Sequence, residues 1–173
     1  RGLGDVYKRQ DGHRLNNYAK NKKTLTGRAT NIAMAMALAS SEVNASMGKI
    51  VACPTAGSCG ILPAVILAAG EVLELSEDEM INGLLAASAV GMIIGMNATL
   101  SGAEGGCQAE CGSASAMGAA AVVELMGGTP KMSLDAGSII LQNVLGLVCD
   151  PVAGLVEIPC AKRNAQGLSL IHI

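Results

Sequence analysis

Aromatic side chains are nearly absent from this sequence: its 173 residues include two tyrosines, no phenylalanine and no tryptophan. A hydrophobic core must therefore be built from Ala, Leu, Ile, Val and Met, and because half of the residues are hydrophobic, a substantial core is available. Ala, Leu and Met favour helices, whereas the aromatic and β-branched alternation typical of strands is scarce. The composition therefore predicts an all-α fold.

An excess of charge of one sign is also missing, since 12 Lys and Arg residues stand against 14 Asp and Glu residues and the formal net charge is −2. Binding to nucleic acid requires a basic patch with stacking aromatic side chains, so we expect no nucleic-acid partner. The sequence has no recognisable secretory signal, which predicts a reducing, cytoplasmic location.

Charged residues are absent from residues 81–103, a stretch long enough to span a bilayer. The stretch includes a GxxxG pair, Gly91 and Gly95, of the kind found where membrane helices pack. However, Ser88 and Asn97 are among several polar residues that dilute it, and no belt of Lys or Arg flanks it. The sequence therefore favours a buried core helix that runs into a polar loop, and we expect no membrane partner.

The two ends of the chain, RGLGDVYKRQ and GLSLIHI, share no pattern with its middle and resemble translated sequencing-adapter sequence. We predict that residues 1–10 and 167–173 are non-native, which leaves His13 as the only native histidine. Residues 11–166 are then expected to form part of one domain of a larger protein.

Helical periodicity and capping signals predict helices over residues 26–44, 61–75, 76–96, 107–126 and 129–145. Ser76 and Glu79 have the spacing of a capping box, and Pro130 suits the first position of a helix. Between and around these helices we predict a polar loop over residues 11–24, an extended segment over 48–53 and irregular structure over 146–159.

Six cysteines are present without a CxxC motif, which excludes the common zinc-ribbon and thioredoxin-like patterns. Cysteines spread through a chain with no secretory features favour thiolates gathered around a metal over disulfides. Cys107, Cys149 and Cys160 each lie near glycine, proline or a carboxylate. Cys107 and Cys111 share one face of a predicted helix, where they can chelate a metal or pack as small hydrophobic residues. Spacing alone does not decide which thiols are ligands.

Two further features can contribute to a site. The loop over residues 54–60 is small, glycine-bearing and hydroxyl-rich, so at a helix N-terminus it suits a bound carboxylate or phosphate, or serves only as a tight cap. Glu104 and Glu110 lie three residues before and after Cys107. A carboxylate there can hold a substrate ammonium or move a proton, although pairing with a helix dipole explains either glutamate equally well.

Three runs carry a more specific signal: SEVNASMGKIVACPTAGSCGILPAV, SGAEGGCQAECGSASAMGAAA and LQNVLGLVCDPVAGLVEIPCAKRNA. Together they resemble the α chain of the iron–sulfur-dependent L-serine dehydratases (L-serine ammonia-lyases), over nearly everything from Ser41 to Asn164. The resemblance implies an all-helical catalytic domain whose glycine-rich loops converge on a [4Fe–4S] cluster. In this family pattern the cluster ligands fall on Cys107, Cys149 and Cys160, and one iron has no protein thiolate.

The resemblance also implies the deamination of L-serine to pyruvate and ammonia, in which the free iron acts as a Lewis acid on the serine hydroxyl. The loop over residues 54–60 then becomes a cradle for the substrate carboxylate. The residues expected to bind substrate are Thr55, Gly57, Ser58, Gly60 and Asn97. The general base is not identified, and the candidates are Glu104 and His13.

A partner follows from the same resemblance, because the two-chain form of the family requires a β chain with an ACT-like regulatory domain. Single-chain members carry a histidine in the segment where this chain has Gln142. Two alternatives to an enzyme stay open on the sequence: a non-catalytic helical relative that binds a metal structurally, and a small membrane-associated helical protein.

Overall fold

The computed structural model describes residues 10–171, with only the backbone of Glu157, and this part of the chain forms seven helices and no sheet. The helices are α2 (Asp11–Asn21), α3 (Arg28–Ala45), α4 (Ile61–Leu73), α5 (Glu77–Asn97), α6 (Gly102–Leu125), α7 (Pro130–Val144) and α8 (Glu157–Ile171). The prediction of an all-α fold is confirmed. The five predicted helices correspond to α3 through α7.

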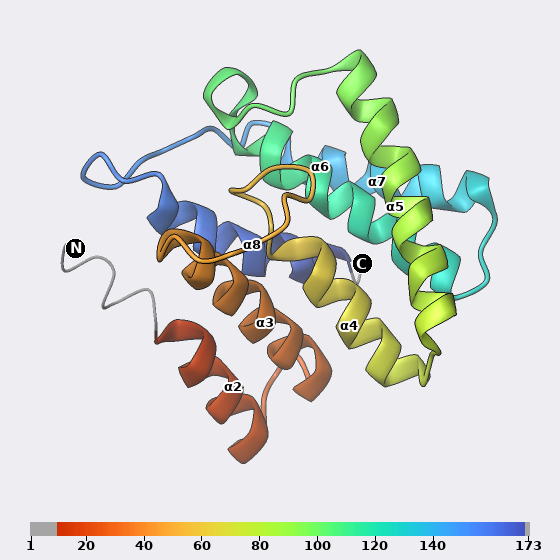
Figure 1. The fold of residues 1–173 in the computed structure, drawn as a ribbon, viewed down its shortest axis with the longest axis horizontal. Coiled ribbons are helices and arrows are strands. Elements are labelled where there is room, and N and C mark those ends of the chain that lie inside the picture. The colour runs from red at the N-terminus through yellow and green to blue at the C-terminus, as the bar shows by residue number, and fades with distance from the viewer. Residues whose placement is uncertain (1–9, 172–173) are drawn as a thin grey trace.

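Helix α6 is the central element, and it contacts α4, α5, α7 and α8 (Figure 1). Small residues make this possible: Ala114, Ser115, Ala116 and Ala120 are all fully buried although they lie on different faces of the helix. With side chains this short, neighbouring helices can approach α6 closely on several sides. The shortage of aromatic residues is therefore met by close helix packing.

Helix α4 joins the two halves of the core, and it lies between α3 and α5 in Figure 1. Ile61 and Val65 pack in one cluster with residues of α3, α6 and α8, whereas Leu62 and Ile66 pack in another with residues of α5 and α6. Each cluster depends on one side of α4, so the helix that follows the loop over residues 54–60 is firmly fixed.

Residues 11–24 were predicted to form a loop, and this prediction is wrong, because α2 occupies most of the segment. The Glu42 carboxylate of α3 accepts hydrogen bonds from the backbone N–H groups of Asp11 and Gly12, at 2.8 and 3.0 Å. Ala19 is buried as well. The helix is thus stabilised by contacts with α3, which the local sequence does not reveal.

The start of α6 also differs from the prediction, since the helix begins at Gly102 rather than at Cys107. Gly106 interrupts it with φ of 76°, a left-handed conformation that favours glycine. A Cβ atom at this position would lie 2.8 Å from the carbonyl oxygen of Leu147. The interruption therefore lets the segment after α7 pass directly against the turn that carries Cys107.

Helix α8 begins at Glu157, so Pro159 lies in its first turn and does not break the chain. The helix continues through residues 167–171, and Leu168 is buried in the core cluster that contains Ile61. Residues 1–9 and 172–173, including His172, lie outside the described residues. That both ends are non-native stays a prediction.

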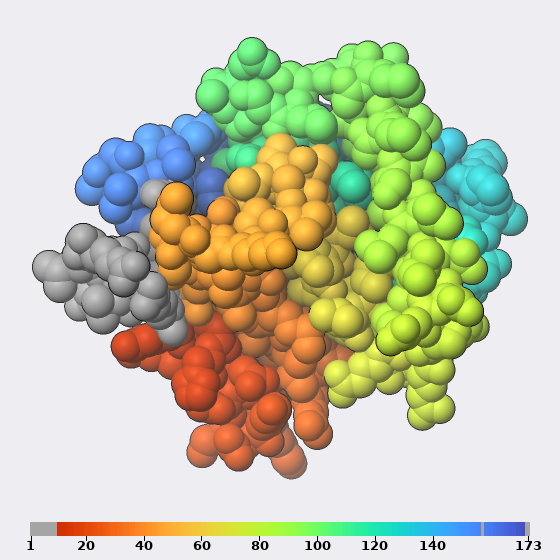
Figure 2. Space-filling model, in the orientation of Figure 1, coloured from red at the N-terminus to blue at the C-terminus, as the bar shows by residue number. Residues whose placement is uncertain are grey.

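Helix α5 was expected to be a buried core helix, and for this chain that expectation is wrong. Its most apolar window has a mean hydropathy of 1.5, yet only 22% of that window is buried. Gly83 and Ala87 face α6, while Leu85 and Met92 are each 63% exposed. By length and composition α5 alone among the described helices could cross a membrane, which is weak support for a span. It runs along the surface seen in Figure 2.

Candidate functional site

A cavity of about 400 Å³ lies where α3, α6 and α8 meet the loop over residues 54–60. Figure 2 shows that loop on the surface, beside the segment that leads into α6. The volume of the cavity falls within the range typical of small-molecule sites. The polar or reactive residues that line it include Asn44, Glu110, Cys149 and Cys160, and Gly57 and Gly102 form part of its wall.

The Glu110 carboxylate is closely enclosed at this cavity. The hydroxyl of Thr55 donates a hydrogen bond of 2.6 Å to its Oε1 atom. A Cβ atom at Gly57 would lie 2.5 Å from Oε1, and one at Gly102 would lie 2.6 Å from Oε2. No side chain fits at either glycine while the carboxylate keeps this position.

The hydroxyl groups of the loop serve its internal structure. The Ser58 hydroxyl lies 2.9 Å from the Thr55 hydroxyl and donates weakly to the carbonyl oxygen of Cys53 at 3.4 Å. Ser58 is fully buried, and Asn44 holds the loop from α3 by donating to the carbonyl oxygen of Ala56 at 2.8 Å. Of the predicted cradle residues, Gly57 lines the cavity and Thr55 reaches its carboxylate, whereas Ser58 lies beneath.

Asn164 of α8 fixes the same loop from the other side and is fully buried. Its Oδ1 atom accepts a hydrogen bond of 2.9 Å from the N–H of Gly60. Its Nδ2 atom donates to the carbonyl oxygens of Gly57 and Cys160, each at 2.7 Å. One amide thus joins the loop to the helix turn that carries Cys160, and it also occupies the N–H of Gly60.

Cys107 of α6 is buried, and Arg163 of α8 lies against it. The Arg163 guanidinium donates to the Cys107 sulfur at 2.7 Å and to the carbonyl oxygen of Val148 at 2.8 Å. It also forms an ion pair with Asp150. Arg163 therefore binds the segment that carries Cys149 to the helix that carries Cys107.

The ionisation of the thiols reflects their closeness. A hydrogen bond from Cys111, together with the Arg163 guanidinium, lowers the pKa of Cys107 to about 6. The hydrogen bond to Cys107 and burial both raise the pKa of Cys111. Burial, followed by the nearby charges of Cys107, Glu110 and Cys149, raises the pKa of Cys160 to about 12. Cys107, Cys149 and Cys160 thus lie near enough to influence one another.

The donor set has the chemistry that an iron–sulfur cluster takes, because it consists of cysteine thiols. Within residues 10–171, no three His, Cys, Asp or Glu side chains are grouped closely enough to hold one metal ion. An iron–sulfur cluster takes its thiolate ligands on separate irons, so its cysteines stand apart around a common space. Cys149 and Cys160 line the cavity, and the thiol of Cys107 lies beside Cys160.

The remaining predicted residues lie away from this cavity. Asn97 is exposed at the end of α5 and donates to the carbonyl oxygen of Ile93 at 2.7 Å. Glu104 is exposed and accepts a 2.6 Å hydrogen bond from the Thr99 hydroxyl. His13 is exposed on α2, 2.9 Å from the Nδ2 atom of Asn17. The cavity lining includes none of Asn97, Glu104 and His13.

Arg163 and Asn164 are site residues that the sequence analysis missed. Their signal was their position three and four residues after Cys160, which places all three on one side of a helix. The prediction of irregular structure up to residue 159 concealed it, because α8 was not expected. Glu110 was considered, but its sequence position fits a helix dipole as well as a cavity.

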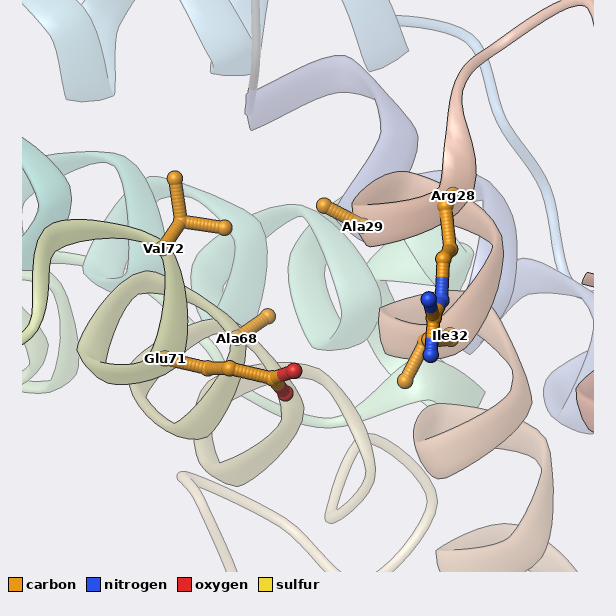
Figure 3. Close-up of a pocket in the computed structure, with 6 residues that line it drawn as sticks. All are labelled: Arg28, Ala29, Ile32, Ala68, Glu71 and Val72. Carbon is orange, nitrogen blue, oxygen red and sulfur yellow. The ribbon is translucent and has the colours of Figure 1, made fainter. Parts of the chain in front are cut away.

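A second depression, of about 260 Å³, lies between α3 and α4. Arg28 and Glu71 point into it from opposite sides, and Ile32 and Ala68 also line it (Figure 3). Arg28 and Glu71 are both exposed, and no cysteine lines this depression. The chemistry expected from the cysteines therefore belongs to the other cavity.

Comparison with known proteins adds independent information. The family model described as serine dehydratase alpha chain matches residues 3–170. The L-serine dehydratase alpha chain of Peptoniphilus asaccharolyticus is 56% identical over 94% of this chain and 56% of its own length. The probable alpha chain from Bacillus subtilis (strain 168) is 53% identical over 92% of this chain and 53% of its own length.

Longer relatives match as well. L-serine dehydratase 1 of Escherichia coli (strain K12) is 48% identical over 75% of this chain, which corresponds to 29% of its own length. The chain therefore spans about half the length of the curated alpha chains that it matches and less than a third of this longer relative.

Proposed function

Because the chain belongs to the serine dehydratase alpha chain family, we propose that it is the catalytic region of an enzyme that converts L-serine into pyruvate and ammonia. The observation that carries this proposal is the cavity that Cys149, Cys160 and Glu110 share. A cavity with thiols and a carboxylate suits a small polar substrate beside a metal centre.

We assign a [4Fe–4S] cluster to Cys107, Cys149 and Cys160. When bound, such a cluster supplies an iron without a protein thiolate, which acts as a Lewis acid on the β-hydroxyl of the substrate. Cys53 and Cys59 belong to the loop and to the packing beneath it, and Cys111 lies behind Cys107 in the buried face of α6. These three thiols are not proposed as ligands.

The protein's own contribution is to shape and fix the cavity. Asn164 holds the loop over residues 54–60 against α8, so Gly57 stays at the cavity wall. Arg163 holds the segment before α8 against α6 and thereby keeps Cys149 near Cys107 and Cys160. Positioning of this kind lowers the barrier of a reaction without contributing a reactive group. Neither Glu104 nor His13 lines the cavity, so neither is proposed to remove the Cα proton.

The relatives named alpha chain support a complementary β chain as the partner. We propose further that this β chain carries an ACT-like regulatory domain and that the complex works in the cytoplasm. The proposal concerns the complete enzyme, since the chain spans only about half of the alpha chains it matches.

The test is to purify the complete α chain with its β chain in the absence of oxygen. We expect a brown protein whose broad visible absorbance fades in air and which releases pyruvate and ammonia from L-serine in equal amounts. A colourless protein that binds zinc and leaves L-serine unchanged would contradict the proposal. That outcome would instead favour a helical relative with a structural metal.

A further inference from the structure

We propose that Glu110 binds the α-ammonium group of the substrate and so selects amino acids over the corresponding hydroxy acids. This inference rests on the proposed function and specifies how the same cavity recognises its substrate. It assigns to Glu110 a binding role and not a role in proton transfer.

The Glu110 carboxylate lies where a ligand of the cavity can reach it. Glu110 lines the cavity together with Cys149 and Cys160, so a ligand that reaches those thiols also comes within reach of Glu110. Gly57 and Gly102 leave room for the carboxylate at places where any Cβ atom would lie within 2.6 Å of one of its oxygens. Side chains at these two positions would displace the carboxylate.

The charge of the cavity lining also favours a cationic group of the ligand. Among the described lining residues, Glu110 alone has a side chain that is ordinarily charged at neutral pH, and these residues include neither Lys nor Arg. In the described part of the chain, the ion pairs do not involve Glu110, and Arg163 pairs with Asp150. A half-buried carboxylate without a cationic partner is best matched by a cationic group of the ligand.

The hydrogen bonds of the Glu110 carboxylate leave acceptor sites free for the ammonium group of a ligand. An ionised carboxylate has about four acceptor sites, and Thr55 occupies one of them through Oε1. The Thr55 hydroxyl also fixes the direction of the carboxylate without neutralising it. An ammonium group has three N–H donors, which suits the remaining acceptor sites.

Glu104 provides the comparison within the same helix. It also lies near the start of α6, where the helix dipole favours negative charge. Its carboxylate is exposed, accepts from Thr99 and does not line the cavity. The dipole accounts for a glutamate at either position, but only Glu110 has a cavity and a pair of glycines arranged around its carboxylate.

The experiment compares L-alanine with L-lactate as ligands of the complete cluster-containing enzyme. Neither ligand has a β-hydroxyl to lose, and the two differ by an ammonium group in place of a hydroxyl. Inhibition constants and anaerobic calorimetry should both give at least about tenfold tighter binding of L-alanine, as one charge-assisted hydrogen bond predicts. Equal affinity of the unaltered enzyme for the two ligands would overturn the inference, and this measurement needs no variant.

The variants then test the residue. Glu110→Gln should reduce that preference about tenfold while iron content and L-lactate affinity change less than about threefold, and Glu104→Gln should leave the preference unchanged. An unchanged preference in Glu110→Gln, or an equal loss for both ligands, would contradict the assignment. Failure of the unaltered enzyme to form pyruvate from L-serine would refute the proposed function instead, so the two failures are distinguishable.

Discussion

The six cysteine thiols have different surroundings in the structure, although they are one residue type in the sequence. Cys59, Cys107 and Cys111 are buried, whereas Cys53, Cys149 and Cys160 are half-buried. Cys107 and Cys111 contact one another on the same helix, so closeness to the site does not separate a ligand from a neighbour. Substitution separates them, because only a ligand is required for iron to stay bound.

We predict that Cys149→Ser removes most of the iron from the complete enzyme, since a hydroxyl is a poor replacement for a thiolate ligand. Cys111→Ala, the matched control, should keep at least about four fifths of it, because Cys111 serves packing. Iron and acid-labile sulfide assays on anaerobic protein measure both. Comparable iron loss in the two variants would mean that the ligand set has been chosen wrongly.

Asn164 gives a second prediction at the residue scale. Asn164→Ala leaves the N–H of Gly60 and the carbonyl oxygens of Gly57 and Cys160 without their partner. At about 1–3 kcal/mol for each buried group that stays unsatisfied, we expect the free energy of unfolding to fall by about 3 kcal/mol.

Urea unfolding of the complete α chain measures this loss. The control is Asn143→Ala, since Asn143 is exposed and donates only within its own helix, to the carbonyl oxygen of Ile139. Its effect should stay within about 0.5 kcal/mol. Equal effects of the two substitutions would show that Asn164 does not fix the loop.

Residue by residue, the sequence allowed part of the site to be predicted. The motif around Cys149 and Cys160 led to two thiols that do line the cavity. Asn97 and Glu104 were expected to bind substrate and to act as a base candidate, respectively, but both are exposed and bonded locally. Arg163 and Asn164 were missed, because their roles depend on partners in distant segments, such as Cys107 and Gly57.

Among the helices, α5 shows how a local signal determines a boundary. The Ser76 hydroxyl accepts from the N–H of Glu79, and the Glu79 carboxylate accepts from the N–H of Ser76 at 2.8 Å. Both halves of the predicted capping box are therefore formed. The side-chain and backbone hydrogen bonds from Ser76 also lower the pKa of Glu79 below its usual value of 4.5.

This lowered pKa gives a pH dependence with a definite sign. A carboxylate whose pKa is depressed by folding stabilises the helix above its unfolded pKa, and the contribution disappears as the pH falls through the folded value. We expect the first-turn amides of α5 to exchange with deuterium faster in Glu79→Gln than in the unaltered protein at pH 7. As the pH falls below 4.5 and through the lowered pKa of Glu79, that difference should disappear.

The control for the capping box is Glu77→Gln, which alters a glutamate of the same turn outside the box. It should speed the exchange of these amides less than Glu79→Gln does. Ser76→Ala should destabilise the helix by about 1 kcal/mol, as expected for the loss of an N-cap. A constant difference between Glu79→Gln and the unaltered protein from pH 3 to pH 7 would contradict the explanation.

Helices with their own start signals were predicted well, and those that rely on other elements were not. Thr129 caps α7 by accepting from the N–H of Met132, and Pro130 stands at its start, as the sequence predicts. Helix α2 depends on Glu42 of α3, which is some 30 residues away. A periodic pattern within one segment carries no trace of such a distant cap.

At the scale of the whole molecule, composition predicted the class of fold correctly, and the resemblance predicted the family. What composition did not predict is the distribution of apolar surface. The outer face of α5 exposes Leu85 and Met92, whereas the centre of α6 is filled by alanine and serine. Hydropathy alone therefore pointed to α5 as the buried helix, although small residues permit the closest approach and occupy the interior.

Asn164 forms hydrogen bonds with Gly60 and Gly57, which precede it in the sequence by 104 and 107 residues. During synthesis the loop and α6 leave the ribosome well before α8 does, at a rate of about 5–20 residues per second. For those seconds the wall that carries Cys160 does not exist. Even a chain folded through α7 offers a small ligand an open surface in place of a pocket. The cavity wall is thus completed only when α8 docks.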